Sequence, residues 1–210
     1  MTCPLCLNKN TEHYHRDNVR EYLQCTVCQL VFVKPENYLN AETEKAIYDL
    51  HQNSPDDEGY RGFLNKLIQP LSQRLQVGMK GLDFGCGPAP TISVMLAESG
   101  YSMENYDVFY ANHPELLQKK YDFITCTEVI EHLHYPYKEL TLLSNLLNEQ
   151  GYLGMMTKRV IDKSRFANWH YKNDPTHVCF YSEDTFEFIA EYWNFKLQVI
   201  NSDCVILKKL

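Results

Sequence analysis

The chain has 210 residues, and its hydrophobic fraction of 44% and charged fraction of 22% are typical of a globular protein and exclude bulk disorder. The formal net charge of −7 argues against broad, sequence-independent nucleic-acid binding, which requires a basic surface. We find no membrane-length apolar segment and no signal peptide, so we expect a cytoplasmic protein with no membrane partner.

The N-terminal segment carries two Cys-x-x-Cys pairs. In a reducing compartment such pairs are typical of metal ligands rather than disulfides. Four thiolates close a tetrahedron around one ion and leave no position for a substrate, which predicts a structural Zn²⁺. We interpret residues 1–34 as a zinc ribbon whose folding depends on the metal. The predicted metal ligands are Cys3, Cys6, Cys25 and Cys28.

Two alternatives for the cysteine pairs remain open. A redox-active pair is one, although such a pair would be expected inside a βαβ unit rather than at the start of the chain. In the other, His13 or His15, which lie between the pairs, binds the metal in place of one cysteine. The charges of residues 1–34 nearly cancel, so the ribbon is not an evident phosphate-binding surface.

The next segment leads from the ribbon to the main domain. Residues 22–33 are rich in β-formers and are predicted to be ribbon strands. Residues 35–78 are interpreted as a helical lead-in or lid. Asn40 can cap a first helix over 41–51, and a second helical pattern contains Pro70, which should break or kink it.

From residue 80 the pattern alternates between strand and helix. Such alternation predicts an α/β fold with a doubly wound parallel sheet, whose ligands bind beyond the carboxyl ends of the strands. The predicted strands cover 81–84, 101–107, 121–127, 151–157, 194–200 and 203–209, and helices begin at Pro90 and cover 136–149 and 183–192.

A glycine-rich turn, Gly85-Cys-Gly-Pro-Ala-Pro90, follows the first of these strands and opens a helix. An acidic residue, Asp107, follows about 20 residues later, where a carboxylate can accept both ribose hydroxyls of a nucleoside cofactor. Dinucleotide binding is an alternative, but the full G-x-G-x-x-G pattern fails because residues 88–90 are Pro-Ala-Pro.

Three motifs resemble those of class I S-adenosylmethionine-dependent methyltransferases. Leu82-Asp83-Phe84-Gly85-Cys86-Gly87-Pro88 resembles their glycine motif, and Tyr121-Asp-Phe-Ile-Thr-Cys-Thr-Glu-Val-Ile-Glu-His-Leu133 resembles their fourth-strand motif. The stretch Asp174-Pro-Thr-His-Val-Cys-Phe-Tyr-Ser182 is similar to a late segment of the subgroup of small-molecule methylases. We therefore interpret residues 79–210 as a Rossmann-like methyltransferase domain.

The resemblance implies a site for S-adenosylmethionine. Gly85 and Gly87 would let the backbone approach the methionine moiety, and Asp83 would orient that turn or the amino group. Asp107 would hold the ribose. The full set of expected cofactor residues is Asp83, Gly85, Cys86, Gly87, Asp107, Cys126, Thr127 and Glu128.

One stretch departs from the family pattern. Residues 108–120 are too few for the usual helix and third strand, so we expect that strand to be absent. The acidic loop that usually contacts adenine would then be missing as well. Phe109 or Tyr110 would cover the adenine ring by stacking.

Methyl transfer needs positioning and, for some acceptors, a base. His177 is the candidate catalytic residue, and a structural histidine that ties its loop to the sheet is the alternative. Glu131 and His132 are expected either at the pocket mouth or in a solvated loop. A substrate-anion site or a solvated face would explain the basic cluster of Lys158, Arg159, Lys163 and Arg165.

The sequence thus predicts a small-molecule methyltransferase with a structural zinc ribbon. An RNA methyltransferase whose ribbon recognises RNA is one alternative, and the acidic composition counts against it. A non-catalytic zinc adapter on a methyltransferase fold is the other, and the intact glycine turn counts against that. Neither the methyl acceptor nor the oligomeric state is predicted.

Overall fold

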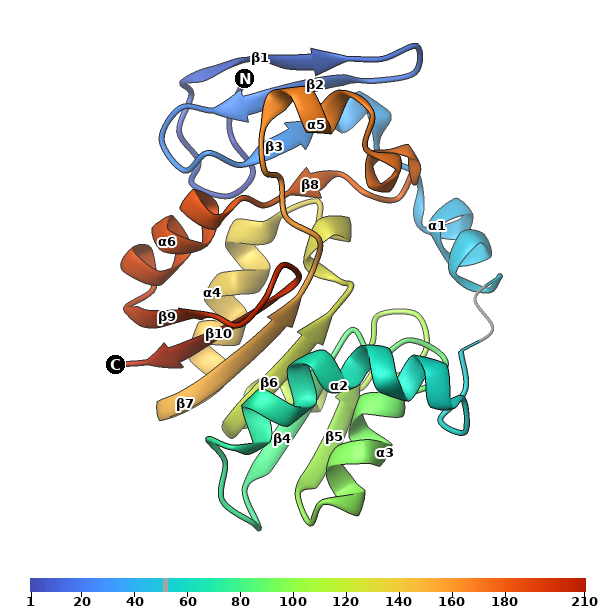
Figure 1. Cartoon of the computed structure of the whole chain (residues 1–210), viewed down its shortest axis with the longest axis vertical. Coiled ribbons are helices and arrows are strands. Elements are labelled where there is room, and N and C mark those ends of the chain that lie inside the picture. The colour runs from blue at the N-terminus through green and yellow to red at the C-terminus, as the bar shows by residue number, and fades with distance from the viewer. Residues whose placement is uncertain (51–52) are drawn as a thin grey trace.

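The computed structural model describes residues 1–50 and 53–210. Its main part is a six-stranded sheet in the order β5-β4-β6-β7-β10-β9 (Figure 1). The strands are β4 (Lys80–Phe84), β5 (Ser102–Tyr106), β6 (Tyr121–Thr127), β7 (Leu147–Met156), β9 (Phe195–Val199) and β10 (Cys204–Lys209). The predicted α/β fold is therefore confirmed.

The direction of the last strands differs from the prediction. Strands β4, β5, β6 and β7 are parallel, as expected, but β10 runs antiparallel to both β7 and β9. The connection between β9 and β10 is only a tight turn, and a parallel pair needs a crossover of a dozen residues or more. The sheet is therefore mixed.

The stretch between β5 and β6 contains no strand of the main sheet. Within the fully described residues 107–120, the only regular features are an isolated bridge between Asp107 and Ala111 and the 3-10 helix η2 (Pro114–Gln118). The expected absence of the third strand is confirmed. The edge strand β5 is consequently half-exposed along its length.

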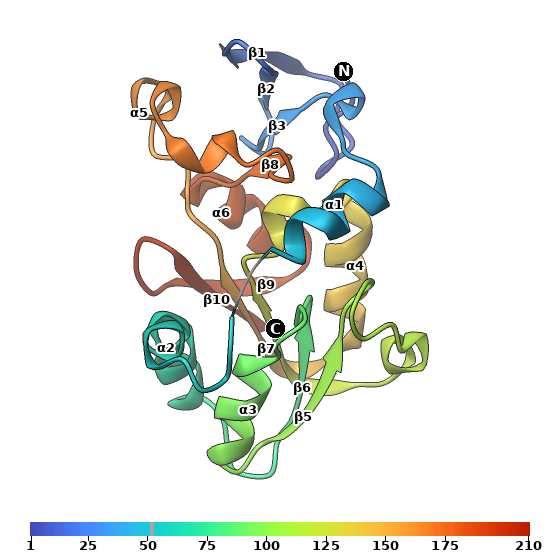
Figure 2. The same ribbon diagram turned by 90° about the vertical axis from the view of Figure 1, so that its right-hand side faces the viewer.

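Helices cover both faces of this sheet (Figure 2). α2 (Glu58–Ser72) and α3 (Thr91–Glu98) pack over one face. α4 (Pro136–Leu146) and α6 (Glu183–Tyr192) pack over the other. Successive residues of a strand point to opposite faces of the sheet. The buried side chains of each strand are therefore divided between the two clusters, one on each face.

Two helix predictions need correction. α2 continues through Pro70, because the lost backbone bond lies in the last turn and the carbonyl of Lys66 instead accepts from the Asn201 amide at 3.4 Å. α4 ends at Leu146 rather than at residue 149. Leu147 instead begins β7 by pairing with Tyr121, so tertiary pairing overrides the local helical pattern.

The N-terminal ribbon forms a second sheet in the order β1-β2-β3-β8. Its strands are β1 (Thr11–Arg16), β2 (Glu21–Cys25), β3 (Val31–Val33) and β8 (Cys179–Phe180). The strands predicted within 22–33 are present, on either side of the second cysteine pair. β1 and the pairing of β3 with β8 were not predicted, and that pairing joins the N-terminal ribbon to residues 179–180 in one sheet.

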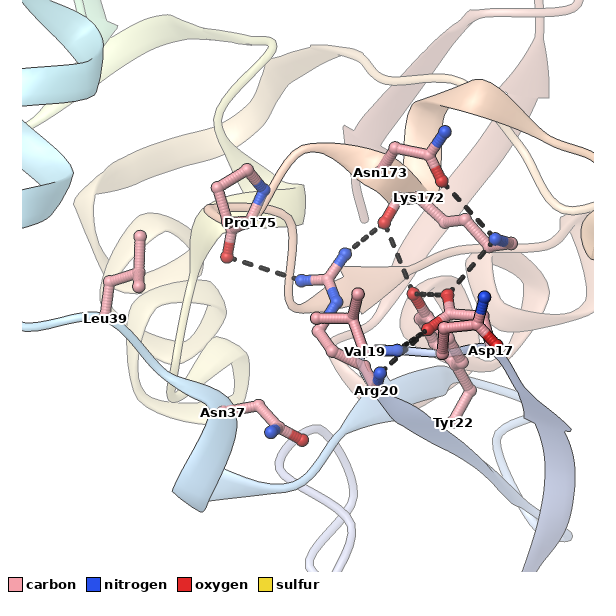
Figure 3. Close-up of a pocket in the computed structure, with 10 residues that line it drawn as sticks. Asp17, Val19, Arg20, Tyr22, Asn37, Leu39, Lys172, Asn173 and Pro175 are labelled. Atoms are coloured by element: carbon pink, nitrogen blue, oxygen red, sulfur yellow. Dashed lines mark hydrogen bonds and ion pairs between the residues drawn. The ribbon is translucent and has the colours of Figure 1, made fainter.

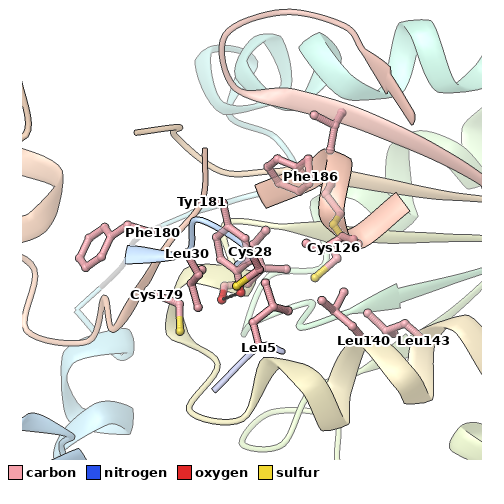
Figure 4. Close-up of a cluster of buried hydrophobic side chains, with 14 of the residues drawn as sticks. Leu5, Cys28, Leu30, Cys126, Leu140, Leu143, Cys179, Phe180, Tyr181 and Phe186 are labelled. Carbon is pink, nitrogen blue, oxygen red and sulfur yellow. Dashed lines mark hydrogen bonds between the residues drawn. The ribbon is translucent and has the colours of Figure 1, made fainter. Parts of the chain in front are cut away.

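The ribbon also shares its hydrophobic core with the main sheet. Leu5 and Leu30 of the ribbon belong to the same buried cluster as Leu140 and Leu143 of α4, and Leu5 lies on the side nearer to Leu140 (Figure 4). A backbone hydrogen bond of 3.2 Å from Tyr137 to Pro4 reinforces this contact. The ribbon is therefore packed against the main sheet as part of the same core.

Short helices complete the chain. They are η1 (Pro35–Asn37), α1 (Ala41–Tyr48), η3 (Ile130–His132), α5 (Lys163–Ala167) and η4 (His170–Asn173). The Asn40 side chain caps α1 as predicted. The helix ends at Tyr48, whereas residue 51, its predicted end, lies outside the described residues. None of the described helices has the length and apolar character to cross a membrane.

Candidate functional site

The four cysteines of the ribbon come together at one point. Their sulfur atoms all lie within 4.8 Å of one another. The sulfur atoms of Cys3 and Cys28 are 3.5 Å apart, and those of Cys6 and Cys25 are 3.4 Å apart. A tetrahedron of thiolates with Zn–S bonds of about 2.3 Å has edges of about 3.8 Å, so the donor set fits zinc.

The surroundings of this four-cysteine cluster also suit a closed metal centre. Cys3, Cys25 and Cys28 are completely buried. Neither His13 nor His15 belongs to the cluster, so four cysteines alone form the predicted ligand set.

A cavity of about 940 Å³ lies at the carboxyl ends of β4, β5 and β6. The glycine turn after β4 forms one wall. α1 contributes Ala41, Glu44 and Tyr48, so part of the predicted lead-in segment covers the cavity. α2 instead packs mainly on the sheet. The cavity has the position expected for the ligand of a doubly wound sheet.

Asp107 organises the glycine turn. One carboxylate oxygen accepts from the Gly87 amide at 3.0 Å. The other accepts from the amides of Phe109 and Tyr110 at 2.8 and 3.1 Å. The residue expected to hold a ribose therefore also ties the turn after β4 to the turn after β5.

The two glycines of the turn have different roles. Both have positive φ, 77° at Gly85 and 63° at Gly87. A Cβ at Gly85 would lie 2.4 Å from the Val129 side chain, whereas a Cβ at Gly87 would meet nothing within 4 Å. Gly85 is thus required by close packing, and only Gly87 leaves backbone open toward the cavity.

Asp83 and Cys86 also line the cavity. The Asp83 carboxylate accepts from the Thr125 hydroxyl at 2.8 Å. Burial, helped by the nearby charge of Asp107, raises the pKa of Asp83 to about 7. Burial likewise raises the pKa of Cys86 to about 12, so this residue remains a thiol near neutral pH.

Of the three residues expected at the end of β6, only Thr127 and Glu128 line the cavity. Cys126 is completely buried in the core on the α4 and α6 side of the sheet (Figure 4). The alternation of the strand explains this, because Cys126 points to the same face as Ile124. Its expected place in the pocket is therefore wrong.

Phe109 and Tyr110 also line the cavity. The Tyr110 hydroxyl donates to Asp49 at 2.6 Å, and the Lys45 ammonium lies 5.0 Å from the centre of the Tyr110 ring. Tyr48 and Phe109 have ring centres 5.9 Å apart. These contacts fasten α1 over this side of the cavity.

Beyond β6, His132 and His177 line the cavity, and the Glu131 carboxylate lies within 4.8 Å of a nitrogen of each ring. Glu131 is 1% exposed and is not a lining residue, so neither the pocket mouth nor a solvated loop describes its position, whereas His132 lies at the cavity. The Tyr171 hydroxyl donates a hydrogen bond to Glu131. Burial, helped by the charge of nearby Glu128, raises the pKa of Glu131 to about 8.

The contacts of His177 bear on both of the interpretations that its sequence position suggested. Its Nδ1 lies 2.7 Å from the Tyr171 carbonyl oxygen, and because a carbonyl only accepts, Nδ1 carries the hydrogen. In the neutral ring Nε2 then holds the lone pair. The residue ties its loop together and also lines the cavity. Burial lowers the pKa of His177, which favours this neutral form.

Arg20, on the ribbon hairpin, holds the loop that carries His177 (Figure 3). Its buried guanidinium donates to the carbonyl oxygens of Asp174 at 3.0 Å, Pro175 at 3.3 Å and His177 at 2.9 Å. It also donates to the carbonyl oxygen of Lys172. Nothing in the local sequence distinguishes Arg20 from the other surface arginines, so sequence reasoning missed it.

The predicted basic cluster does not reach the cavity. None of Lys158, Arg159, Lys163 and Arg165 is among its lining residues. Arg159 instead donates to the backbone oxygens of Asn201 and Ser202 and pairs with Glu183. These contacts favour the interpretation of a surface face over a substrate-anion site.

Known proteins resemble this chain mainly in fold. A family model described as a methyltransferase domain matches residues 57–199, whereas no curated protein matches the chain. An S-adenosylmethionine-dependent methyltransferase from Archaeoglobus fulgidus is 18% identical, with a TM-score of 0.54 over 73% of this chain and 100% of that one. Magnesium protoporphyrin IX methyltransferase from Synechocystis, with bound S-adenosylhomocysteine, is 15% identical, with a TM-score of 0.54 over 83% and 97%.

A candidate sarcosine dimethylglycine methyltransferase from Galdieria sulphuraria is 17% identical and has a TM-score of 0.50 over 63% of this chain. The chain spans only 61% of the length of that protein. These likenesses establish the fold, and the family model covers well over half of the chain. Together with the cavity beside the glycine turn, they show that the chain belongs to the class I S-adenosylmethionine-dependent methyltransferases.

Proposed function

We propose that the protein transfers a methyl group from S-adenosylmethionine to a small-molecule acceptor. The observation that carries this proposal is one continuous cavity whose lining includes both the glycine turn and the two histidines His132 and His177. Its volume of about 940 Å³ lies at the upper end of the usual range for ligand sites, and it therefore suits a cofactor together with a small acceptor.

Different residues of the cavity would bind the cofactor and remove the acceptor's proton. The open backbone at Gly87 and the carboxylate of Asp107 would hold the nucleoside and methionine parts. When bound, S-adenosylmethionine supplies a methyl group on a sulfonium whose leaving group is a neutral thioether. The Nε2 lone pair of His177 would assist loss of the acceptor's proton.

The ribbon would hold a structural Zn²⁺ through Cys3, Cys6, Cys25 and Cys28. Four thiolates leave no position for a substrate, so the ion would supply folding energy rather than chemistry. Arg20 gives the ribbon a link to the active site, because it fixes the backbone that carries His177. This role in positioning needs no RNA contact.

The test is methyl transfer from labelled S-adenosylmethionine to a metabolite extract and, in parallel, to total RNA. We expect label in small molecules only. His177→Asn is the informative variant, because its side-chain amide can still donate to the Tyr171 carbonyl while the Nε2 lone pair is lost. It should lose about 10²- to 10⁴-fold in rate with little change in cofactor affinity or melting temperature.

Two outcomes would overturn this proposal. Label that appears only in RNA would favour the RNA methyltransferase alternative. A chain that does not bind S-adenosylmethionine in calorimetry would instead favour a non-catalytic adapter. A near-wild-type rate for His177→Asn would remove His177 from the mechanism.

A further inference from the structure

We propose that Glu131, His132 and His177 bind a divalent transition-metal ion in the wall of the cavity, at a site separate from the four-cysteine cluster. One carboxylate oxygen and one nitrogen from each imidazole lie within 4.8 Å of one another. Two histidines and one carboxylate form a donor set that suits Mn²⁺, Fe²⁺, Co²⁺ or Zn²⁺ better than Mg²⁺ or Ca²⁺.

The carboxylate of Glu131 shows why a cation fits there. Tyr171 donates to one of its oxygens, whereas the other, Oε2, is buried and has no hydrogen-bond partner among the described residues. A buried polar atom without a partner is rare in folded proteins because its desolvation is not compensated. A bound cation would supply the missing interaction.

The histidines are oriented as metal ligands usually are. His177 donates its Nδ1 hydrogen to the Tyr171 carbonyl at 2.7 Å, and the Nδ1 of His132 lies 3.3 Å from the Thr176 carbonyl. Each ring thus presents Nε2 as the ligating nitrogen. A backbone carbonyl on the other ring nitrogen fixes the tautomer and ring orientation of a ligating histidine.

Three separate segments hold this cluster together. η3 supplies Glu131 and His132 directly after β6, and the loop before β8 supplies His177. A backbone hydrogen bond of 2.8 Å from Val178 to Glu131 fixes the two segments to each other, and Arg20 fixes the loop from the ribbon side. The site is therefore built on supported backbone rather than on a free loop.

The site also opens toward the cavity. His132 and His177 are among the cavity-lining residues, and three protein ligands leave at least one coordination position for a further donor. The following consequence rests on the proposed function. With the ion bound, the Nε2 lone pair of His177 would be donated to the metal, so His177 would act through the ion and not as the base itself. An acceptor oxygen or nitrogen bound to the ion would release its proton to solvent more readily and then attack the methyl carbon, while the C–S bond electrons return to sulfur.

The test is titration of the zinc-loaded protein with Mn²⁺, followed by electron paramagnetic resonance of the unbound ion. Mn²⁺ prefers oxygen and nitrogen donors, so it should not displace zinc from thiolates. We expect about one equivalent of Mn²⁺ per chain at the three-ligand site. Glu131→Gln should weaken this binding at least about tenfold, because the anionic ligand is lost while the acceptor for Tyr171 remains.

Glu139→Gln is the matched control. Glu139 lines the cavity and, like Glu131, has a buried oxygen without a described partner, but it has no place in the histidine cluster. Its replacement should leave Mn²⁺ binding unchanged. Circular dichroism would verify the fold of both variants, and His132→Gln would replace Glu131→Gln if the latter did not fold.

No uptake of Mn²⁺ by the zinc-loaded protein would overturn the inference, as would equal uptake by wild type, Glu131→Gln and His132→Gln. The Mn²⁺ titration is done without cofactor or acceptor, so its result does not depend on whether the protein transfers methyl groups. A protein that binds Mn²⁺ but transfers no methyl group would contradict the proposed function alone.

Discussion

The ribbon and the cavity wall each bring metal-ligating side chains together, but they treat those side chains in opposite ways. The ribbon brings four thiols together and leaves no access from solvent to three of them, Cys3, Cys25 and Cys28. The cavity is lined instead by acidic residues such as Asp83 and Glu128. Their burial raises the pKa of each to about 7. The first arrangement stabilises a fold, and the second leaves interactions for a ligand to complete.

The largest expected effect concerns the ribbon. Cys25→Ser/Cys28→Ser should lose the zinc, and with it folding energy on the order of 10 kcal/mol at neutral pH. Elemental analysis and urea unfolding would measure both quantities. The exposed, non-ligating pair Thr26→Ser/Val27→Ala is the control. Wild-type stability in the cysteine variant would show that this cluster is not structural.

Alanine substitutions at Gly85 and Gly87 would test whether each glycine is required by close packing or only by its backbone conformation. Gly85→Ala places a methyl group 2.4 Å from Val129 at a positive φ. We expect a destabilisation of about 2 to 5 kcal/mol from strain and overpacking. Gly87→Ala, whose new methyl group meets nothing nearby, should lose only about 1 to 2 kcal/mol. Equal losses in thermal unfolding would contradict the assignment of different roles to the two glycines.

Ionisation of the buried Asp83 should lower the stability of the folded chain. The folded-state pKa of about 7 is above the unfolded value, so the folded chain binds more protons between these values. Its stability should therefore fall as the pH rises from about 4 to 7. Asp83→Asn removes this loss and should gain up to about 4 kcal/mol above pH 8 and little below pH 4.

Urea unfolding of the cofactor-free protein at pH 5 and pH 8 would measure the effect of Asp83→Asn. The exposed Asp56→Asn variant should differ little from wild type at either pH. A gain for Asp83→Asn that is the same at both pH values would contradict burial as its cause.

Arg20 tests the link between the two regions. Arg20→Ala leaves four loop carbonyls without their charged donor, and we expect a loss of roughly 3 kcal/mol in stability together with a lower rate of methyl transfer. The exposed Arg16→Ala on the same hairpin should change stability by less than about 0.5 kcal/mol. An unchanged rate of methyl transfer in Arg20→Ala would show that the ribbon does not affect the active site through Arg20.

The smallest expected effect is on cofactor affinity. Asp107→Ala should weaken binding of S-adenosylmethionine by about ten- to a hundredfold, the value of one or more charged hydrogen bonds. Calorimetry would measure it, and Asp107→Asn, which keeps an acceptor oxygen, should lose less. Unchanged affinity in Asp107→Ala would limit Asp107 to its bonds with the turn amides.

Local signals predicted most of the fold and part of the site. The strand, glycine turn and helix around Gly85 are encoded by neighbouring residues, so they were visible in the sequence. The antiparallel end of the sheet and the buried face of Cys126 were not. Both depend on which strands become neighbours, and a pattern of residue types does not contain that information.

Long-range contacts explain the remaining omissions at the site. Glu131 was singled out in the sequence, but its burial was not predicted, because that burial comes from Tyr171 and the loop that carries His177. Arg20 reads as one of several hairpin charges, and its role follows only from the approach of residues 172–177. Neither partner is adjacent in sequence, so only the folded chain identifies these residues.

The pairing of β3 with β8 has a consequence for biosynthesis. Val31 pairs with Phe180, so the ribbon emerges from the ribosome long before its fourth strand is made. During that interval β3 has an unpaired edge, which can pair with strands of other chains. Chains that stop before residue 179 would keep this edge exposed and should aggregate even when loaded with zinc. We therefore expect the solubility of the newly made ribbon to depend on completion of its last strand.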